Sequence, residues 1–279
     1  MAEPATLIER IAENLLYDKA RRVFDAVYAW PRRTVLSSVA APTLVGHRGL
    51  TGHPSVVENT LGAFQLAVDR GAGFELDVRL TADDVVVVCH DASLSRAHGR
   101  SELVSALSVA ELRAAAPAVP TLGEVLAQLG DAAPAIFIEV KHIGAKLRTL
   151  VGLVRDALCA RGLVAKCTLI SLDTAVIDVV RDVFPEATRA LIFLASPRRA
   201  REYVEHCRDT GLVGWYAAFP EGCRQLLHRH GLVEGVGFIN WPSTAVAFRN
   251  RGFPYLFTDR VDFLGAPAGG PVRSGISAR

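Results

Sequence analysis

The chain has 279 residues, half of which are hydrophobic, and its formal net charge at pH 7 is +2. An α/β barrel of about 250 residues is one domain, so this length requires no domain boundary. Because the charge is near balance and the arginines are scattered along the chain, the composition disfavours a nucleic-acid groove and a polyanionic partner.

The cysteines and the amino terminus indicate the compartment. The five cysteines form no Cys-X-X-Cys pair, and an odd number argues against a closed disulfide framework. No apolar run reaches the roughly 18 residues of a membrane span, and Glu3 and Glu9 interrupt the basic-then-apolar order of a secretory signal. We therefore expect a cytoplasmic protein with reduced thiols.

The first predicted element is an amphipathic helix. Residues 5–30 show helical periodicity, which Trp30-Pro31 ends, so residues 1–40 are predicted to form a helical extension. Its apolar face fits packing against the barrel or a partner subunit. Its aromatic and basic residues also fit peripheral contact with a membrane, although its acidic residues oppose an anionic surface. Both interpretations stay open.

From residue 43 onward, short β-like runs alternate with helical patterns, which is typical of parallel β-α-β units. The eight candidate strands are 43–47, 73–79, 135–140, 167–171, 188–193, 213–218, 235–240 and 254–258. The candidate helices between them are 60–70, 145–161, 174–183, 197–209, 221–230 and 243–251. This count predicts a (β/α)8 TIM barrel over residues 41–265.

Two further segments depart from the simple alternation. The apolar run 85–89 is predicted to pair with the second strand as a hairpin. Residues 92–118 then form a short insertion after the second strand, with a helical stretch over 108–116 and too few residues for an independent core. The last segment, 266–279, is rich in Gly, Pro and Ser, and we expect it to be disordered.

Carboxylates stand where the predicted strands end. Glu75 and Asp77 are two residues apart on one strand, so their side chains share a face. Glu139 ends another strand and adds a third carboxylate. Oxygen ligands favour magnesium, calcium or manganese over zinc. The sequence therefore predicts a site for one divalent cation.

Two histidines and two basic residues also lie at predicted strand ends, where barrel enzymes carry their active sites. His47 and His90 titrate near neutrality, so they could divide general base and general acid roles. Arg48 and Lys141 could hold phosphate oxygens. Glu58 precedes a helix; a hydrogen bond to Arg48 is the favoured role, and direct metal contact is the alternative. This set predicts a phosphodiesterase.

Several motifs together resemble the glycerophosphodiester phosphodiesterase family over residues 43–263. Shorter matches continue in 170–173, at Trp241 and at Thr258-Asp259. The main matching segments are His47-Arg48-Gly49, Glu58-Asn59-Thr60, Glu75-Leu76-Asp77-Val78-Arg79-Leu80-Thr81, Val88-Cys89-His90-Asp91 with Leu94 and Arg96, Pro120-Thr121-Leu122 and Ile138-Glu139-Val140-Lys141.

The resemblance implies hydrolysis of glycerophosphodiesters to an alcohol and sn-glycerol 3-phosphate on a TIM barrel that binds Mg2+ or Ca2+. It implies that His47 is the general base and His90 the general acid, with a cyclic phosphate formed on the way. It further implies that the metal ligands are Glu75, Asp77 and Glu139 and that the phosphate contacts are Arg48 and Lys141.

Three departures from the family pattern spare these positions. Val57 stands where a proline is usual, Asp84 stands where a glycine often turns the hairpin, and 240–243 match a late tryptophan motif only in part. We expect Trp241 to contact the leaving group, with core packing as the alternative. The departure at 240–243 leaves the leaving-group pocket, and thus the alcohol, undefined.

Other functions fit less of the sequence. An amidohydrolase would carry a second histidine where Gly49 stands. A lysophospholipase D or sphingomyelinase-D-like activity on a lipid would use the same site and is the closest rival. A non-catalytic binding protein is the alternative of a different class. The sequence does not indicate the oligomeric state.

Overall fold

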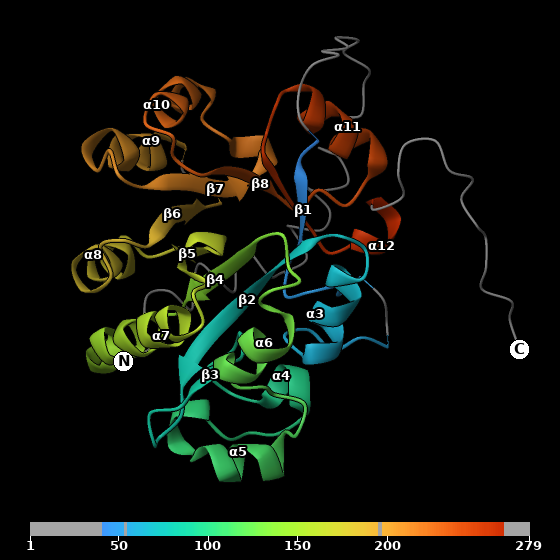
Figure 1. Cartoon of the computed structure of the whole chain (residues 1–279), viewed down its shortest axis with the longest axis vertical. Coiled ribbons are helices and arrows are strands. Elements are labelled where there is room, and N and C mark those ends of the chain that lie inside the picture. The colour runs from blue at the N-terminus through green and yellow to red at the C-terminus, as the bar shows by residue number, and fades with distance from the viewer. Residues whose placement is uncertain (1–40, 53–54, 195–196, 265–279) are drawn as a thin grey trace, which may run out of the picture.

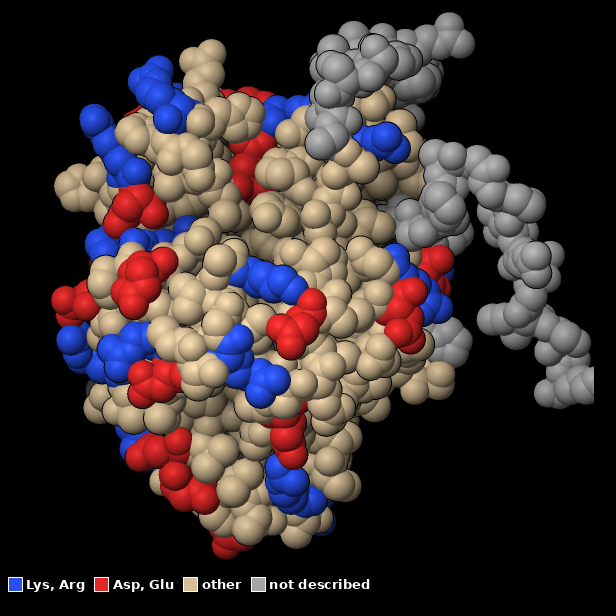
Figure 2. All heavy atoms as spheres, in the orientation of Figure 1, with Lys and Arg blue, Asp and Glu red and all other residues tan. Residues whose placement is uncertain are grey.

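A computed structural model describes residues 41–52, 55–194 and 197–264 (Figure 1). The predicted helical extension over 1–40 and the predicted tail over 266–279 lie outside the described residues. In the described part, no helix is both long and apolar enough to span a membrane. Figure 2 shows that basic and acidic side chains are intermixed on one face of the molecule, as the near-balanced composition leads one to expect.

Eight parallel strands of the described chain close into a barrel, with helices around the outside (Figure 1). The first strand pairs with both the second and the last, which joins the two ends of the sheet. The predicted (β/α)8 TIM barrel is confirmed. Its strands are β1 (Thr43–Gly46), β2 (Gly73–Leu80), β4 (Ile136–Val140), β5 (Cys167–Ser171), β6 (Thr188–Phe193), β7 (Gly211–Trp215), β8 (Glu234–Gly237) and β9 (Tyr255–Thr258).

Helices connect the strands and bury one apolar face each against the sheet. In α7, for example, Leu147, Leu150, Val151, Val154 and Leu158 are buried, a spacing that places them on one side of the helix. The helices that follow barrel strands in the described chain are α3 (Leu61–Val68), α6 (Leu122–Leu129), α7 (Leu147–Ala160), α8 (Thr174–Val183), α9 (Pro197–His206), α10 (Arg224–Arg229), α11 (Pro242–Asn250) and α12 (Val261–Leu264).

The helix α6 carries the crossover from β2 to β4 and was not predicted. Its start has a recognisable signal: Thr121 and Glu124 form a capping box, in which each side chain accepts a hydrogen bond from the backbone N–H of the other. The segment Thr121-Leu122-Gly123-Glu124 contains a glycine, which weakens the helical pattern. The capping box was the stronger signal.

The predicted hairpin and insertion are present. β3 (Val86–Val88) pairs antiparallel with β2, and Asp84 adopts a left-handed conformation with φ 59° at the turn. The insertion contains α4 (Ser95–His98) and α5 (Val109–Ala115) around a small core. The hairpin brings Cys89, just after β3, back beside β2, where its N–H donates a hydrogen bond to the Asp77 carbonyl.

β1 ends one residue earlier than predicted, and β7 and β8 each end three residues earlier; the last two corrections concern the site. β7 ends at Trp215 because residues 216–218 form a 3-10 turn. β8 ends at Gly237 because Phe238 has φ 65°, a left-handed conformation that no strand residue adopts. The turn after β8 frees Asn240 to bind another strand end through its side chain.

Inside the barrel, an apolar layer lies under the functional strand ends. Val45, Phe137 and Phe257 belong to one buried cluster. They precede His47, Glu139 and Asp259 by two residues, so each shares the inward face of its strand with a polar side chain at the next level. This layer forms a rigid floor for the groups above it.

Candidate active site

A cavity of about 380 Å³ opens at the carboxyl ends of the strands. His47 follows β1 and His90 follows β3, and both imidazoles line this cavity together with Glu75, Glu139 and Lys141. The structure thus brings together side chains that are up to 94 residues apart in the sequence.

The turn after β1 is shaped by two residues with positive φ, Arg48 (56°) and Gly49 (86°). A Cβ atom on Gly49 would lie 2.7 Å from the Ala63 backbone, so only glycine fits there. The turn directs the Arg48 backbone N–H toward Glu75, to whose Oε2 it donates a hydrogen bond of 2.9 Å. The strained turn therefore holds Glu75 in place.

Three buried carboxylates converge below the histidines. Glu75 and Asp77 lie on β2, and Glu139 on β4 is the direct neighbour of Asp77 in the sheet. One oxygen of each lies within 4.8 Å of the others. Asn59 donates a hydrogen bond of 2.7 Å to Asp77. Buried oxygen donors in this arrangement fit a hard divalent cation.

The electrostatics of this trio also fit a cation. Burial and the charge of Asp77 raise the pKa of Glu75 to about 8, and burial raises the pKa of Glu139. Burial also disfavours charge on Asp77, but the cationic Lys141, with His90 and Arg48, holds its pKa well below the usual range. A divalent cation would favour the ionised form of all three groups.

Arg48 and Lys141 neutralise part of this charge. Lys141 Nζ lies 2.6 Å from Glu139 Oε1 and 2.9 Å from Asp77 Oδ1. Arg48 donates to Glu58 at 3.0 Å, the contact that the sequence analysis favoured for Glu58, and its Nε lies 3.6 Å from Asp77. Both cations also line the cavity, where a phosphate could reach them.

His47 is held by a carboxylate from the last strand. Its Nδ1 lies 2.9 Å from Asp259 Oδ1, and Asn240 donates a 2.8 Å hydrogen bond to Asp259 Oδ2 and accepts one from the Asp259 N–H. Burial and the charge of Arg48 lower the pKa of His47, but Asp259 and Glu75 outweigh them, so the pKa is raised. A proton on Nδ1 leaves Nε2 for proton exchange.

His90 has its own carboxylate partner. Its Nδ1 lies 2.7 Å from Asp91 Oδ1, and Asp91 Oδ2 accepts a 2.6 Å hydrogen bond from Arg96 on α4. Arg96 also binds Glu58 through two hydrogen bonds. Burial and the charge of Lys141 lower the pKa of His90 to about 4, although Asp77 and Asp91 oppose this shift.

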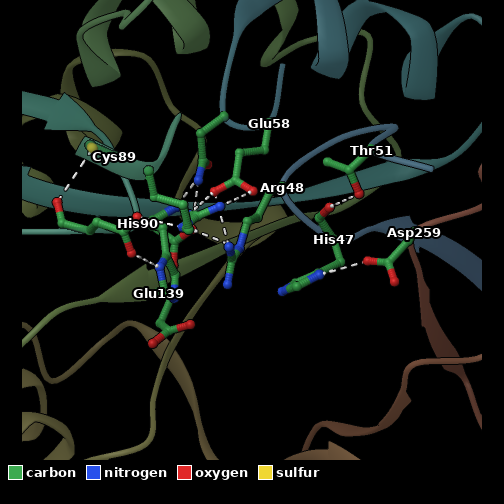
Figure 3. A network of polar contacts seen from close by, with 12 residues as sticks. His47, Arg48, Thr51, Glu58, Cys89, His90, Glu139 and Asp259 are labelled. Carbon is green, nitrogen blue, oxygen red and sulfur yellow. Dashed lines mark hydrogen bonds and ion pairs between the residues drawn. The ribbon is translucent and has the colours of Figure 1, made fainter. Parts of the chain in front are cut away.

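The pKa values of the two imidazoles are therefore shifted in opposite directions. In the view of Figure 3, Arg48 lies between His90 and the pair of His47 and Asp259. At neutral pH the lowered pKa leaves His90 neutral, whereas the raised pKa of His47 favours its charged form. A pair with one neutral and one protonated imidazole can accept a proton on one side and donate one on the other.

The cavity has two unlike halves. The charged half, contributed by β1 to β4 and the residues that follow them, consists of His47, Arg48, Glu75, His90, Arg96, Glu139 and Lys141. The apolar half, contributed by β5 to β9 and the residues that follow them, consists of Ile170, Leu172, Ile192, Leu194, Val213, Gly214, Gly237, Phe238 and Phe257.

Trp241, the expected leaving-group contact, is not among the described residues that line the cavity. It is the N-cap residue of α11 and is 48 % exposed, so it does not pack in the core either. The left-handed turn at Phe238 places that ring on the cavity wall instead, 5.5 Å from the His47 ring. A positive φ at a phenylalanine has no clear sequence signal.

Four polar residues that support the histidines had no assigned role in the sequence analysis: Asp91, Arg96, Asn240 and Asp259. Asp259 follows β9 as Lys141 follows β4, so the strand-end rule that found the other groups applied to it as well. Arg96 lies in the insertion, whose position over the barrel could not be read from its sequence.

Comparisons with known proteins agree with this geometry. A family model described as the glycerophosphoryl diester phosphodiesterase family matches residues 47–263. A glycerophosphodiester phosphodiesterase from Caldanaerobacter subterraneus is 34 % identical over 110 residues, which are 35 % of this chain and 44 % of that protein. A lysophospholipase D of Rattus norvegicus is 46 % identical over 69 residues, which are 24 % of this chain and 21 % of that protein. The chain thus matches less than half the length of these curated relatives.

Solved structures extend the likeness over the barrel. The glycerophosphodiester phosphodiesterase of Thermotoga maritima is 29 % identical with a TM-score of 0.68, covering 81 % of this chain and 97 % of that one. An Oleispira antarctica phosphodiesterase, solved with the product sn-glycerol-3-phosphate, has the same fold at 24 % identity, with a TM-score of 0.68 and coverage of 78 % of this chain and 93 % of that one. The chain belongs to the glycerophosphoryl diester phosphodiesterase family.

Proposed function

We propose that this chain is a metal-dependent glycerophosphodiester phosphodiesterase that releases an alcohol and sn-glycerol 3-phosphate. One observation carries the proposal: Glu75 and Glu139, which converge with Asp77 in a buried carboxylate trio, line the same cavity as two histidines, each of which contacts its own aspartate. The family match and the phosphodiesterases of similar fold support the same activity.

Glu75, Asp77 and Glu139 would hold one Mg2+ or Ca2+. The cation would polarise the phosphodiester and neutralise charge as it develops on the phosphoryl oxygens. Arg48 and Lys141, which line the cavity beside the trio, would contact the remaining oxygens. To do so, Lys141 would exchange part of its contact with Asp77 and Glu139 for the phosphate.

In the first step, His47 takes the proton from the glycerol 2-hydroxyl, whose oxygen attacks the phosphorus. The bond from phosphorus to the alcohol oxygen breaks, and His90 donates a proton to that oxygen. The products are the free alcohol and a cyclic phosphate. An internal hydroxyl is favoured over water because it is already positioned beside the phosphorus.

In the second step, the roles exchange. His90 takes a proton from water, the water oxygen attacks the phosphorus, and His47 returns its proton to the glycerol 2-oxygen as that bond breaks. The net reaction consumes one water. Asp259 and Asp91, each within hydrogen-bond distance of one Nδ1, would keep a proton on that nitrogen and leave Nε2 to exchange the other.

The pKa directions of the two histidines are the reverse of the starting states that this sequence of steps needs. His47 must begin neutral, although its pKa is raised, and His90 must begin protonated, although its pKa is lowered to about 4. An anionic phosphodiester beside His90 would raise the pKa of that imidazole. The reverse assignment, with His90 as the first base, uses the same residues.

Product analysis tests the proposal. Purified protein is freed of metal with a chelator, and Mg2+ or Ca2+ is added back singly with a glycerophosphodiester. We expect sn-glycerol 3-phosphate and the alcohol to appear only with cation. An analogue without the 2-hydroxyl should turn over at least about 100-fold more slowly, since effective molarities of internal nucleophiles are large.

Two results would count against the proposal. Undiminished hydrolysis after complete chelation would mean that the reaction does not need the cation. Equal turnover of the analogue without the 2-hydroxyl would rule out the cyclic phosphate intermediate, although the assignment as a phosphodiesterase would still hold.

A further inference from the structure

The polarity of the cavity wall changes abruptly between neighbouring strands. Glu139 on β4 and Ile170 on β5 are direct partners in the sheet, and both line the cavity. Ile192 on β6 and Val213 on β7 are likewise partners and continue the apolar wall. Among the described lining residues of the apolar half, no side chain can donate or accept a hydrogen bond.

We propose that the apolar half binds a substrate group that presents methyl or methylene carbons and carries no N–H or O–H. This inference rests on the proposed function, because the group is one of the two that are esterified to the phosphate. It goes further by excluding leaving groups and glycerol substituents that need hydrogen-bond partners.

The physical reason is desolvation. An ammonium or hydroxyl group that enters the apolar half loses its hydrogen bonds to water and gains none from a side chain there. A hydrocarbon group loses no hydrogen bond and gains from leaving water, in proportion to the area that it buries. The hydrogen bonds that a group loses on entering the apolar half therefore affect its binding more than its shape does.

Two kinds of substrate carry such a group. A trimethylammonium headgroup presents methyl carbons and is also attracted to aromatic faces, and Phe238 and Phe257 lie on this wall. An acyl or alkyl chain on the glycerol presents methylene carbons. The two share the chemistry that the wall recognises, and a substrate panel distinguishes them.

The headgroup arm compares glycerophosphocholine with glycerophosphoethanolamine, which differ only in three N-methyl groups. The acyl arm compares lysophosphatidylethanolamine with glycerophosphoethanolamine, which differ only in the acyl chain. We expect at least one arm to show a kcat/KM about tenfold or more higher for the methylated or acylated compound, since one unpaired buried donor has an effect of this size. The arm that responds identifies the source.

Variants locate the effect in the cavity. Val213→Thr adds a hydroxyl to the wall at nearly constant shape, and Leu194→Gln adds an amide at a half-buried position, so a folding defect in one leaves the other informative. Each variant should lower the ratio of kcat/KM values in the responding comparison at least about threefold, because the new polar side chain gives a substrate N–H or O–H a hydrogen-bond partner. Val246→Thr on α11, where the side chain is 55 % exposed, is the matched control and should keep the ratio.

The outcomes separate this inference from the proposed function. If all compounds are turned over with kcat/KM ratios near one, or if both variants leave the ratios unchanged, the inference about the apolar half is wrong. The assignment as a phosphodiesterase would still hold. No turnover of any compound with either cation would overturn the proposed function itself.

Discussion

The two halves of the cavity are built from the same barrel positions and yet differ in nearly every property. In the charged half, Glu139 on β4 is buried, contacts Lys141 and has a pKa that burial raises. In the apolar half, the sheet partner of Glu139 is Ile170, and Ile192 on β6 also lines the wall. Under the proposed function, bond breaking is confined to the charged half and the apolar half contributes selectivity.

The largest expected effect comes from removing an imidazole of the charged half. His90→Ala should lower kcat on the order of 1000-fold, because a positioned acid-base group contributes roughly 100- to 10,000-fold. His206→Ala, on the exposed side of α9, is the matched control. Steady-state kinetics with both variants measures the effect.

If the halves differ as described, His90→Ala lowers kcat by the same factor for every substrate. If His90→Ala instead kept kcat for one substrate and lowered it for another, His90 would contribute to selectivity. The proposed division of roles between the two halves would then be wrong.

A smaller effect is expected from the carboxylate that holds His47. Asp259→Asn should lower kcat/KM on the order of 10- to 100-fold, because the imidazole loses a charged partner. Asp259 raises the pKa of His47, so its loss lowers that pKa. Because the pKa of His47 is the higher of the two, it sets the basic limb of the pH profile, which should move to lower pH.

The pH dependence of kcat/KM separates this role from a structural one. Asp262→Asn, a nearby carboxylate that pairs with Arg260, should leave the basic limb in place. A fall in activity of Asp259→Asn with an unmoved limb would mean that Asp259 supports the loop and not the imidazole.

The smallest effect concerns stability and the cation. The folded-state pKa of Glu75, about 8, lies above its ordinary value of 4.5. A buried carboxyl of this kind stabilises the fold fully below its unfolded pKa, and that contribution is lost as pH rises through about 8. Mg2+ or Ca2+ should therefore raise the melting temperature by a few degrees at pH 8 and by less at pH 6.

Thermal unfolding with Glu75→Gln tests the source of this effect. The variant should show a flatter pH dependence without metal and a smaller shift with cation, whereas Glu202→Gln on α9, an exposed carboxylate, should behave as the parent protein does. An equal cation shift in Glu75→Gln would mean that the cation binds elsewhere.

Much of the charged half could be predicted because its pattern is local. Glu75 and Asp77 share a face through the two-residue period of a strand, and Glu139 and Lys141 follow the same rule on β4. The barrel then places all strand ends at one edge. Period and topology together were enough to bring these groups and His47 to one place.

The supporting contacts could not be predicted in this way. Asp259 reaches His47 from 212 residues away, and Arg96 reaches Glu58 from an insertion whose path depends on its own small core. Phe238 enters the wall through a left-handed turn that side-chain type does not indicate. The tryptophan was the more conspicuous residue, and its position after that turn puts it outside the cavity.

Anomalous diffraction from crystals soaked in Mn2+ tests the central claim most directly, because Mn2+ takes the same oxygen ligands as Mg2+ and scatters anomalously. The account predicts one strong peak within about 2.0 to 2.6 Å of oxygens from Glu75, Asp77 and Glu139, and none in a Glu75→Gln crystal. A peak elsewhere, with this trio unoccupied in protein that hydrolyses glycerophosphodiesters, would contradict it.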